Sequence, residues 1–161
     1  EAFEYARNQG VATMTSAGNF RKDLNEIQHY PSGFSLGNDP NTSIFFISAG
    51  RTGVQLWPLT NFRAGGRPGA HFMVAPGANL LGFIPRHFGA NNNVGRKSGT
   101  SVATPFATAL AAHYHHLHPG ADPTVLRNTL LTEINAQGTA GTINYEGGTY
   151  PYKVFNWVIL P

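Results

Sequence analysis

Apolar residues recur at spacings of three and four between positions 100 and 117, the period that places side chains on one face of an α-helix. These residues are Ala103, Phe106, Ala107, Leu110, Ala111 and Tyr114. The segment His118-Pro119-Gly120 follows and has the composition of a helix stop. Pro105 lies near the start, where we expect proline to be tolerated because first-turn N–H groups have no intrahelical partner. The pattern therefore predicts a helix over residues 100–117.

Shorter patterns predict further helices and strands. We expect one helix over residues 1–8, ended by Gly10, and another over residues 122–132, with Asp122 as its N-cap and Pro123 at its first position. Residues 21–42 are polar and contain glycine and proline, which indicates a long surface loop. Apolar runs bounded by glycine or proline predict strands over residues 11–15, 43–49, 54–57, 71–74, 80–84 and 150–160. Alternating buried strands and helices indicate an α/β fold with a partial doubly wound, mainly parallel sheet flanked by helices.

Composition and charge fit a single globular domain and exclude several classes of function. Of the 161 residues, 41% are hydrophobic, which is enough for a core. The 11 lysines and arginines are scattered among predicted loops and leave a net charge of +3, which argues against nucleic acid as a partner. No apolar run is long enough to cross a bilayer, so we expect no membrane partner. The absence of cysteine excludes a disulfide framework.

Ser101 lies between a glycine and the predicted helix and is a candidate nucleophile. Gly99 has no Cβ, so it can adopt a bend that other residues resist and lets a substrate come close to the main chain. At a helix start, free N–H groups and the positive end of the helix dipole lie beside such a serine oxygen. These donors suit an oxyanion.

The segment 99–105, Gly-Thr-Ser-Val-Ala-Thr-Pro, resembles the serine motif of the subtilisin-like serine proteases, the subtilases. Residues 11–19 resemble the strand that ends in the oxyanion asparagine of that family. Residues 73–77, Met-Val-Ala-Pro-Gly, resemble the strand end before its serine loop. The three segments occur in the family's order, and the resemblance covers essentially the whole chain. It implies that residues 1–161 are the C-terminal portion of a subtilisin-like peptidase domain.

By this resemblance, Asn19 belongs to the oxyanion hole. Its side-chain N–H and the backbone N–H of Ser101 would point at the oxygen that becomes negative in the tetrahedral intermediate. The alternative is that Asn19 only completes a turn after Gly18, since Gly-Asn is ordinary turn chemistry. Upstream of a Gly-Thr-Ser motif we favour the catalytic interpretation.

The resemblance also implies a substrate pocket. Ser16, Ala17 and Gly18 match the small-residue wall that receives the side chain before the scissile bond, which would leave a roomy pocket, although a buried strand end explains them too. Thr100 would add a hydroxyl donor to the oxyanion site, or else serve only as a helix N-cap. Tyr30-Pro31 resembles a family segment in which a cis peptide bond precedes the proline.

The other two members of a Ser-His-Asp triad are not recognisable in this chain. In the subtilases Asp and His precede the oxyanion asparagine, yet only 18 residues precede Asn19 here. We therefore expect an N-terminal fragment of the same protease to supply them, and this chain alone to be inactive. His71 and His87 have no setting that marks a base. The histidines at 113, 115, 116 and 118 begin 12 residues after Ser101, about 18 Å along a helix.

The same four histidines, His113, His115, His116 and His118, raise the question of a metal. Pairs at a spacing of three lie on one helix face, but histidines at a helix C-terminus also interact favourably with its dipole, and we favour that structural role. We thus expect no metal ligands in this cluster. The family resemblance implies calcium as a cofactor, although no ligand set in this chain matches one.

The sequence thus predicts a serine endopeptidase that cleaves protein or peptide substrates through an acyl-enzyme on Ser101, with Asn19 in the oxyanion hole. The alternative is a noncatalytic protease fragment or pseudoenzyme that acts as a protein-binding module. A lipase is disfavoured because Ala103 replaces the last glycine of a Gly-x-Ser-x-Gly elbow. The triplet Asn41-Thr42-Ser43 is a glycosylation signal compatible with secretion, and we expect an extracellular protein.

Overall fold

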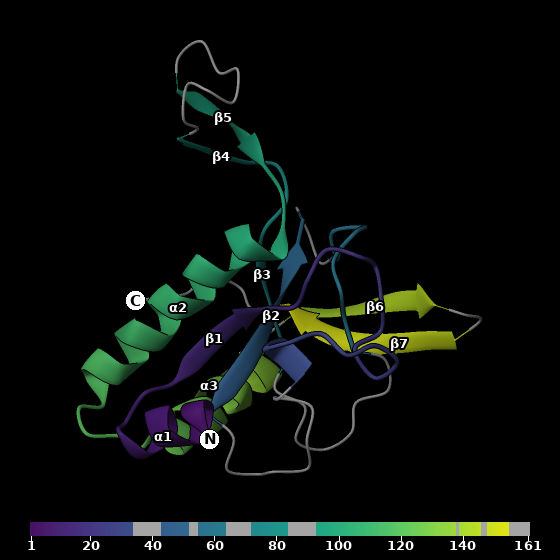
Figure 1. Ribbon diagram of the computed structural model, residues 1–161. Coiled ribbons are helices and arrows are strands. Elements are labelled where there is room, and N and C mark those ends of the chain that lie inside the picture. Colours follow the sequence, from purple (N-terminus) through teal and green to yellow (C-terminus); the bar gives the residue numbers. More distant parts are fainter. Residues whose placement is uncertain are drawn as a thin grey trace.

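The structure is a computed structural model that describes residues 1–33, 43–51, 55–63, 72–83, 93–137, 139–145 and 148–154. Figure 1 shows a central sheet with a long helix across it and a two-stranded hairpin that stands away from the body. In chain order the elements are α1 (Ala2–Asn8), β1 (Thr13–Ser16), β2 (Ile44–Gly50), β3 (Phe72–Pro76), β4 (Leu80–Phe83), β5 (Val94–Lys97), α2 (Thr100–Leu117), α3 (Pro123–Gln137), β6 (Thr139–Tyr145) and β7 (Gly148–Val154).

The main sheet has the strand order β1-β2-β3-β7-β6, and its first four strands are parallel. Only β6, at the far edge, runs antiparallel to its neighbour β7. Parallel strands end at the same edge of a sheet, so the segments that follow β1, β2 and β3 meet there. The predicted α/β class with a mainly parallel sheet is confirmed.

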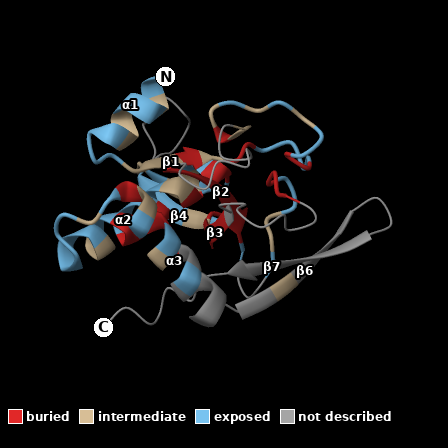
Figure 2. Cartoon of the chain, turned by 90° about the horizontal axis from the view of Figure 1, so that it is seen from below, coloured by how far each residue is buried: buried red, intermediate tan, exposed pale blue. Residues whose placement is uncertain are grey.

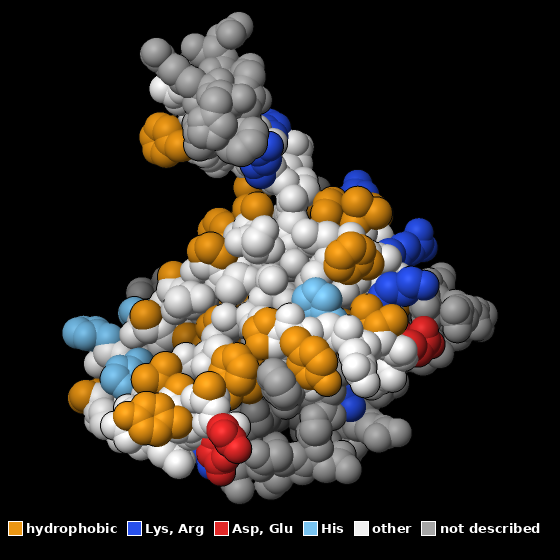
Figure 3. Space-filling model, in the orientation of Figure 1, with side chains coloured by type: hydrophobic (Ala, Val, Ile, Leu, Met, Phe, Trp, Pro, Cys, Tyr) orange, Lys and Arg blue, Asp and Glu red, His pale blue; other side chains and the backbone are white. Residues whose placement is uncertain are grey.

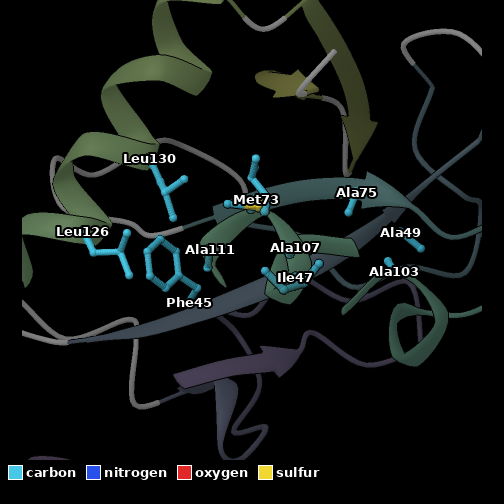
Figure 4. Close-up of a cluster of buried hydrophobic side chains, with 11 residues drawn as sticks. Phe45, Ile47, Ala49, Met73, Ala75, Ala103, Ala107, Ala111, Leu126 and Leu130 are labelled. Carbon is cyan, nitrogen blue, oxygen red and sulfur yellow. The ribbon is translucent and has the colours of Figure 1, made fainter. Parts of the chain in front are cut away.

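Helices α2 and α3 cover one face of this sheet. Three alanines of α2, at positions 103, 107 and 111, face the strands and let the helix lie close because they have no bulk beyond Cβ. Leu126 and Leu130 from α3 complete the cluster against Phe45 and Met73 (Figure 4). This apolar layer fixes the position of α2 and, with it, the position of its first turn.

Strand β2 is buried along its whole length, on both faces of the sheet (Figure 2). Phe45 and Ile47 point toward α2, whereas Phe46 points to the other face, because side chains alternate along a strand. On that other face Phe46 packs against Ala17 and Leu24 from the connection after β1. The core therefore anchors this connection as well as the helix.

The three predicted helices are confirmed, although α3 extends further than expected, to Gln137. Asp122 caps α3 as predicted, since its Oδ1 accepts a hydrogen bond from the backbone N–H of Thr124 at 2.7 Å. The strands expected over residues 11–15, 43–49, 71–74 and 80–84 correspond to β1, β2, β3 and β4. The last predicted strand, 150–160, falls partly on β7 and partly outside the described residues.

Other expectations were wrong or incomplete. β5 and β6 were not predicted. In place of a strand over 54–57, the structure has a single bridge between Gly50 and Leu56, and residues 52–54 lie outside the described part. The segment 21–33 is not a simple surface loop, because Asp23 and Leu24 are buried. The peptide bond between Tyr30 and Pro31 is cis, as the resemblance implied.

Within the described residues, no helix is both long enough and apolar enough to cross a membrane. The same part of the chain contains no cluster of three or more histidine, cysteine or acidic residues that could hold a metal ion. Asn41 and Thr42 of the glycosylation triplet lie outside these residues.

Candidate active site

Ser101 is the second residue of α2 and is exposed. Gly99 precedes the helix as its N-cap with a φ of 153°, a backbone angle that residues with side chains rarely adopt. Its N–H donates to the carbonyl oxygen of Gly77 at 2.8 Å. A Cβ on Gly77 would lie 2.7 Å from the Cβ of Ala49 and 2.8 Å from that of Ala103. The glycine after β3 therefore lets the serine turn pack directly on the end of the sheet.

Asn19 reaches the same turn from the end of β1. Gly18, with a φ of 98°, turns the chain just before it. The Asn19 Oδ1 accepts hydrogen bonds from the backbone N–H of Thr100 at 2.9 Å and from its hydroxyl at 3.0 Å. Because a backbone N–H can only donate, the atom that faces Thr100 is the amide oxygen, and Nδ2 is the free end of the amide.

The amide nitrogen of Asn19 and the hydroxyl of Ser101 border one small space. A Cβ on Gly99 would lie 3.5 Å from Asn19 Nδ2 and 3.5 Å from Ser101 Oγ, so the missing side chain keeps this space open. The N–H of Ser101 belongs to the first turn of α2, where backbone donors have no intrahelical acceptor. The turn thus combines a nucleophilic oxygen with two N–H donors, the groups that acyl transfer requires.

Thr100 is not the helix N-cap that one interpretation expected. Gly99 occupies that position, and Thr100 is the first helical residue, with only 1% of its surface exposed. Its hydroxyl oxygen accepts a hydrogen bond from the N–H of Gly18 at 3.1 Å while its proton is donated to Asn19. Thr100 therefore ties the end of β1 to the start of α2.

Pro105 is accommodated in α2, but the expected reason is wrong. It is the sixth helical residue and lies beyond the first turn. Since proline has no N–H, the carbonyl oxygen of Ser101 lacks the donor that a residue four positions later would supply. The Thr104 hydroxyl donates to the carbonyl oxygen of Thr100, at 2.8 Å, and so does not replace the donor that the Ser101 carbonyl lacks.

An open groove of about 680 Å³ runs between β1 and α2 beside Ser101. Of the three predicted pocket-wall residues, Ser16 lines this groove, while the Ala17 side chain is fully buried in the core and Gly18 is buried below Asn19. The groove is lined by Met14, Thr15, Ser16, Ser101, Thr104, Pro105, Thr108, Ala109 and Ala112.

The histidine cluster lies at the far end of α2 from Ser101, and the rings of Tyr114 and His118 are 6.0 Å apart there. His71 and His87 lie outside the described residues. His29, to which the sequence assigned no role, approaches Gly18: its Nε2 is 2.7 Å from the point where a Cβ would stand. Its other ring nitrogen lies 2.8 Å from the Oγ of buried Ser32.

Asn61 was also missed at the sequence level. Its side chain is fully buried, and its Nδ2 donates to the carbonyl oxygen of Ala17 at 2.9 Å. No local pattern marks it, because its partners lie some forty positions earlier in the chain. Only the folded structure reveals that this asparagine contacts the connection that carries Asn19.

Comparison with known proteins gives two matches at the level of sequence. Residues 1–148 match the family model for Peptidase S8, the subtilase family. The subtilase-type proteinase isp6 of Schizosaccharomyces pombe is 37% identical over 57 residues, which cover 35% of this chain and 12% of that protein.

Solved structures with a similar fold include the prenylagaramide maturation protease PagA, which is 26% identical with a TM-score of 0.63 over 87% of this chain and 44% of that one. A cold adapted subtilisin-like serine proteinase is 22% identical with a TM-score of 0.63 over 94% of this chain and 46% of that one. This chain therefore spans less than half the length of these relatives. Since the family match covers most of its length, the chain belongs to the subtilase family of serine peptidases.

Proposed function

We propose that this chain supplies the nucleophile half of a serine endopeptidase active site. The observation that supports this most strongly is the common space bordered by Asn19 Nδ2 and Ser101 Oγ above Gly99. A carbonyl carbon held there would face the hydroxyl, and its oxygen would face the amide. The two hydrogen bonds from Thr100 fix the orientation of the Asn19 amide, so its Nδ2 donor is in place before the substrate binds.

In the proposed reaction, Ser101 Oγ attacks the carbonyl carbon of a peptide bond while a histidine takes the hydroxyl proton. The carbonyl oxygen becomes negative and accepts hydrogen bonds from Asn19 Nδ2 and the Ser101 N–H. The C–N bond then breaks, the amine leaves with the proton from histidine, and an ester on Ser101 remains. Water attacks this ester by the same route, which releases the acid and restores the hydroxyl.

The histidine and the aspartate that orients it would come from an N-terminal portion of the same protease. Two surfaces suit such a partner. β1 is the edge strand of the described sheet, and an unpaired edge presents N–H and C=O groups to another strand. Beside it, α2 lines the groove at Ser101 with the exposed apolar residues Pro105, Ala109 and Ala112. Figure 3 shows hydrophobic side chains along this helix. A segment that covers both would place its residues over the groove at Ser101.

For the substrate we propose a protein or peptide whose side chain before the scissile bond enters a pocket with Ser16 in its wall, while the buried residues Ala17 and Gly18 lie behind that wall and support it. Thr100 belongs to this site through the hydrogen bonds that it makes with Gly18 and Asn19. An extracellular location remains a prediction.

A fluorophosphonate probe tests the proposal, because it phosphonylates only an activated serine. The chain is treated with and without the portion that carries Asp and His, and the modified residue is mapped by mass spectrometry. We expect labelling at Ser101 only in the assembled protein, and none in its Ser101→Ala variant. An assembled protein that is never labelled would favour the noncatalytic, protein-binding alternative.

A further inference from the structure

The side chain of Asn61 binds the main chain on both sides of Asn19. Its Oδ1 accepts hydrogen bonds from the N–H groups of Phe20 and Lys22, each at 3.0 Å. Its Nδ2 donates to the carbonyl oxygen of Ala17 at 2.9 Å. One amide thus satisfies three backbone groups of the segment 17–22, two residues before Asn19 and up to three residues after it.

The main chain of Asn61 continues this contact and is itself held by the sheet. Its N–H donates to the carbonyl oxygen of Gly18 at 2.8 Å. Its carbonyl oxygen accepts hydrogen bonds from the hydroxyl of Ser48 in β2, at 2.6 Å, and from that of Thr60, at 3.1 Å. The segment that carries Asn19 is therefore connected through Asn61 to a fully buried strand.

The segment also packs closely on this amide. A Cβ on Gly18 would lie 2.6 Å from Asn61 Nδ2, so the main chain of Gly18 lies directly against it. Without the amide, the Ala17 carbonyl and the Phe20 and Lys22 N–H groups would lose their partners and the segment would shift to find others. Such a shift matters at an oxyanion donor, because the stabilisation depends on donor distances of about 2.7–3.1 Å.

We propose that Asn61 is a positioning residue of the active site, which sets the place of Asn19 while Thr100 sets the direction of its amide. This inference rests on the proposed role of Asn19 as the oxyanion donor. Asn61 is completely buried and acts through Asn19.

The test compares two asparagine substitutions in the assembled protease. Asn61→Ala removes the amide that holds residues 17–22. Asn25→Ala is the matched control, because the Asn25 amide bonds the side chains of Asp23, two residues earlier, and of Arg63, two residues after Asn61. We expect Asn61→Ala to lower kcat about tenfold or more with KM changed less than about threefold, and Asn25→Ala to leave kcat within about twofold.

A double-mutant cycle with Asn19→Ala separates positioning from general destabilisation. If Asn61 acts through Asn19, Asn61→Ala lowers kcat less than about twofold once Asn19 is already alanine. An equal loss in both backgrounds, or no loss beyond that of Asn25→Ala, would overturn the positioning role alone. If Asn19→Ala instead has the kcat of the wild type, Asn19 is not the oxyanion donor. That result would contradict the proposed function and, with it, the positioning role of Asn61.

Asn61→Asp keeps the shape of the residue and serves if the alanine variant does not fold. The carboxylate still accepts from Phe20 and Lys22 but faces the Ala17 carbonyl without a proton to donate. Once protonated, it restores all three hydrogen bonds. We expect the kcat of this variant relative to wild type to rise as the pH falls, and a ratio independent of pH would contradict the proposal.

Discussion

The amide oxygen of Asn19 accepts two hydrogen bonds from Thr100, one from its backbone N–H and one from its hydroxyl. This pair joins the end of β1 to the start of α2 and leaves the Asn19 Nδ2 directed to the space above Gly99. Because Asn19 and Ser101 lie on different elements, these two hydrogen bonds help to align the two halves of the site.

Thr100→Val tests this alignment, since valine keeps the shape and removes the hydroxyl. We expect a loss of about 1–2 kcal/mol in unfolding free energy, because Gly18 and Asn19 each lose a partner. In the assembled protease kcat should fall by about ten- to a hundredfold. Thr132→Val, which removes a hydroxyl bonded within α3, is the control and should leave kcat unchanged. Equal activity of the two variants would contradict the orienting role of Thr100.

Gly18→Ala should destabilise the protein by about 1–3 kcal/mol, because a φ of 98° strains alanine and the new Cβ would meet Asn61 and His29 at 2.6 and 2.7 Å. Gly120→Ala is matched for backbone angle, with a φ of 84° but no atom within 4 Å of the Cβ position. Chemical denaturation of both variants separates the steric clash from the backbone strain. We expect Gly18→Ala to lower the free energy of unfolding clearly more than Gly120→Ala. Equal losses would show that Asn61 and His29 can move aside without a cost in stability.

Gly77→Ala should push the serine turn away from the sheet. The new Cβ would lie within 3 Å of Ala49, Ala103 and the Gly99 carbonyl oxygen, so we expect a loss of about 1–3 kcal/mol. Gly82→Ala in β4 has open space at its Cβ position and should be close to neutral. Thermal unfolding of the two variants makes the comparison. A neutral Gly77→Ala would mean that the turn does not pack as tightly as the structure indicates.

The pKa of Asp122 lies below its ordinary value, mainly because the backbone N–H of Thr124 donates to the carboxylate. A carboxyl group whose pKa is lowered by folding stabilises the folded state at neutral pH, and this contribution is lost as the pH falls through that pKa. Asp122→Ala should therefore lower the unfolding midpoint at pH 7, and the difference from wild type should shrink in acid. A difference that stays constant with pH would show that the charge of the cap contributes nothing.

The sequence predicts the helices and the parallel core well, because the spacing of apolar residues and the glycine and proline residues that bound each element are local properties of the sequence. The alanines of α2 recur on one face, and the apolar run of β2 is bounded by turn residues, so each element is recognisable by itself. Residues 54–57 show the limit of such patterns. Trp57 packs against the core, and its backbone N–H donates a hydrogen bond to the carbonyl oxygen of Ala49 in β2. The apolar run therefore contacts β2 through a short bridge and not through a regular strand.

At the proposed site, motifs in the sequence predict roles for Ser101 and Asn19, but they do not predict how these residues are held. The hydrogen bond between Thr100 and Asn19 joins residues 81 positions apart, and Asn61 contacts residues about forty positions away. These bonds depend on the register of the parallel strands, which no local pattern encodes. Threonine and asparagine in loops also have many other uses, so their residue types alone carry little information.

In the proposed reaction, Asn19 and Ser101 act on the same carbonyl group. A crystal structure of the assembled protease with a peptide phosphonate bound covalently to Ser101 tests it directly, because the phosphonyl oxygen takes the place of the oxyanion. We expect this oxygen to lie about 2.7–3.1 Å from both Asn19 Nδ2 and the Ser101 backbone nitrogen. An oxygen that points away from Asn19, with the amide nitrogen beyond about 3.5 Å, would contradict it.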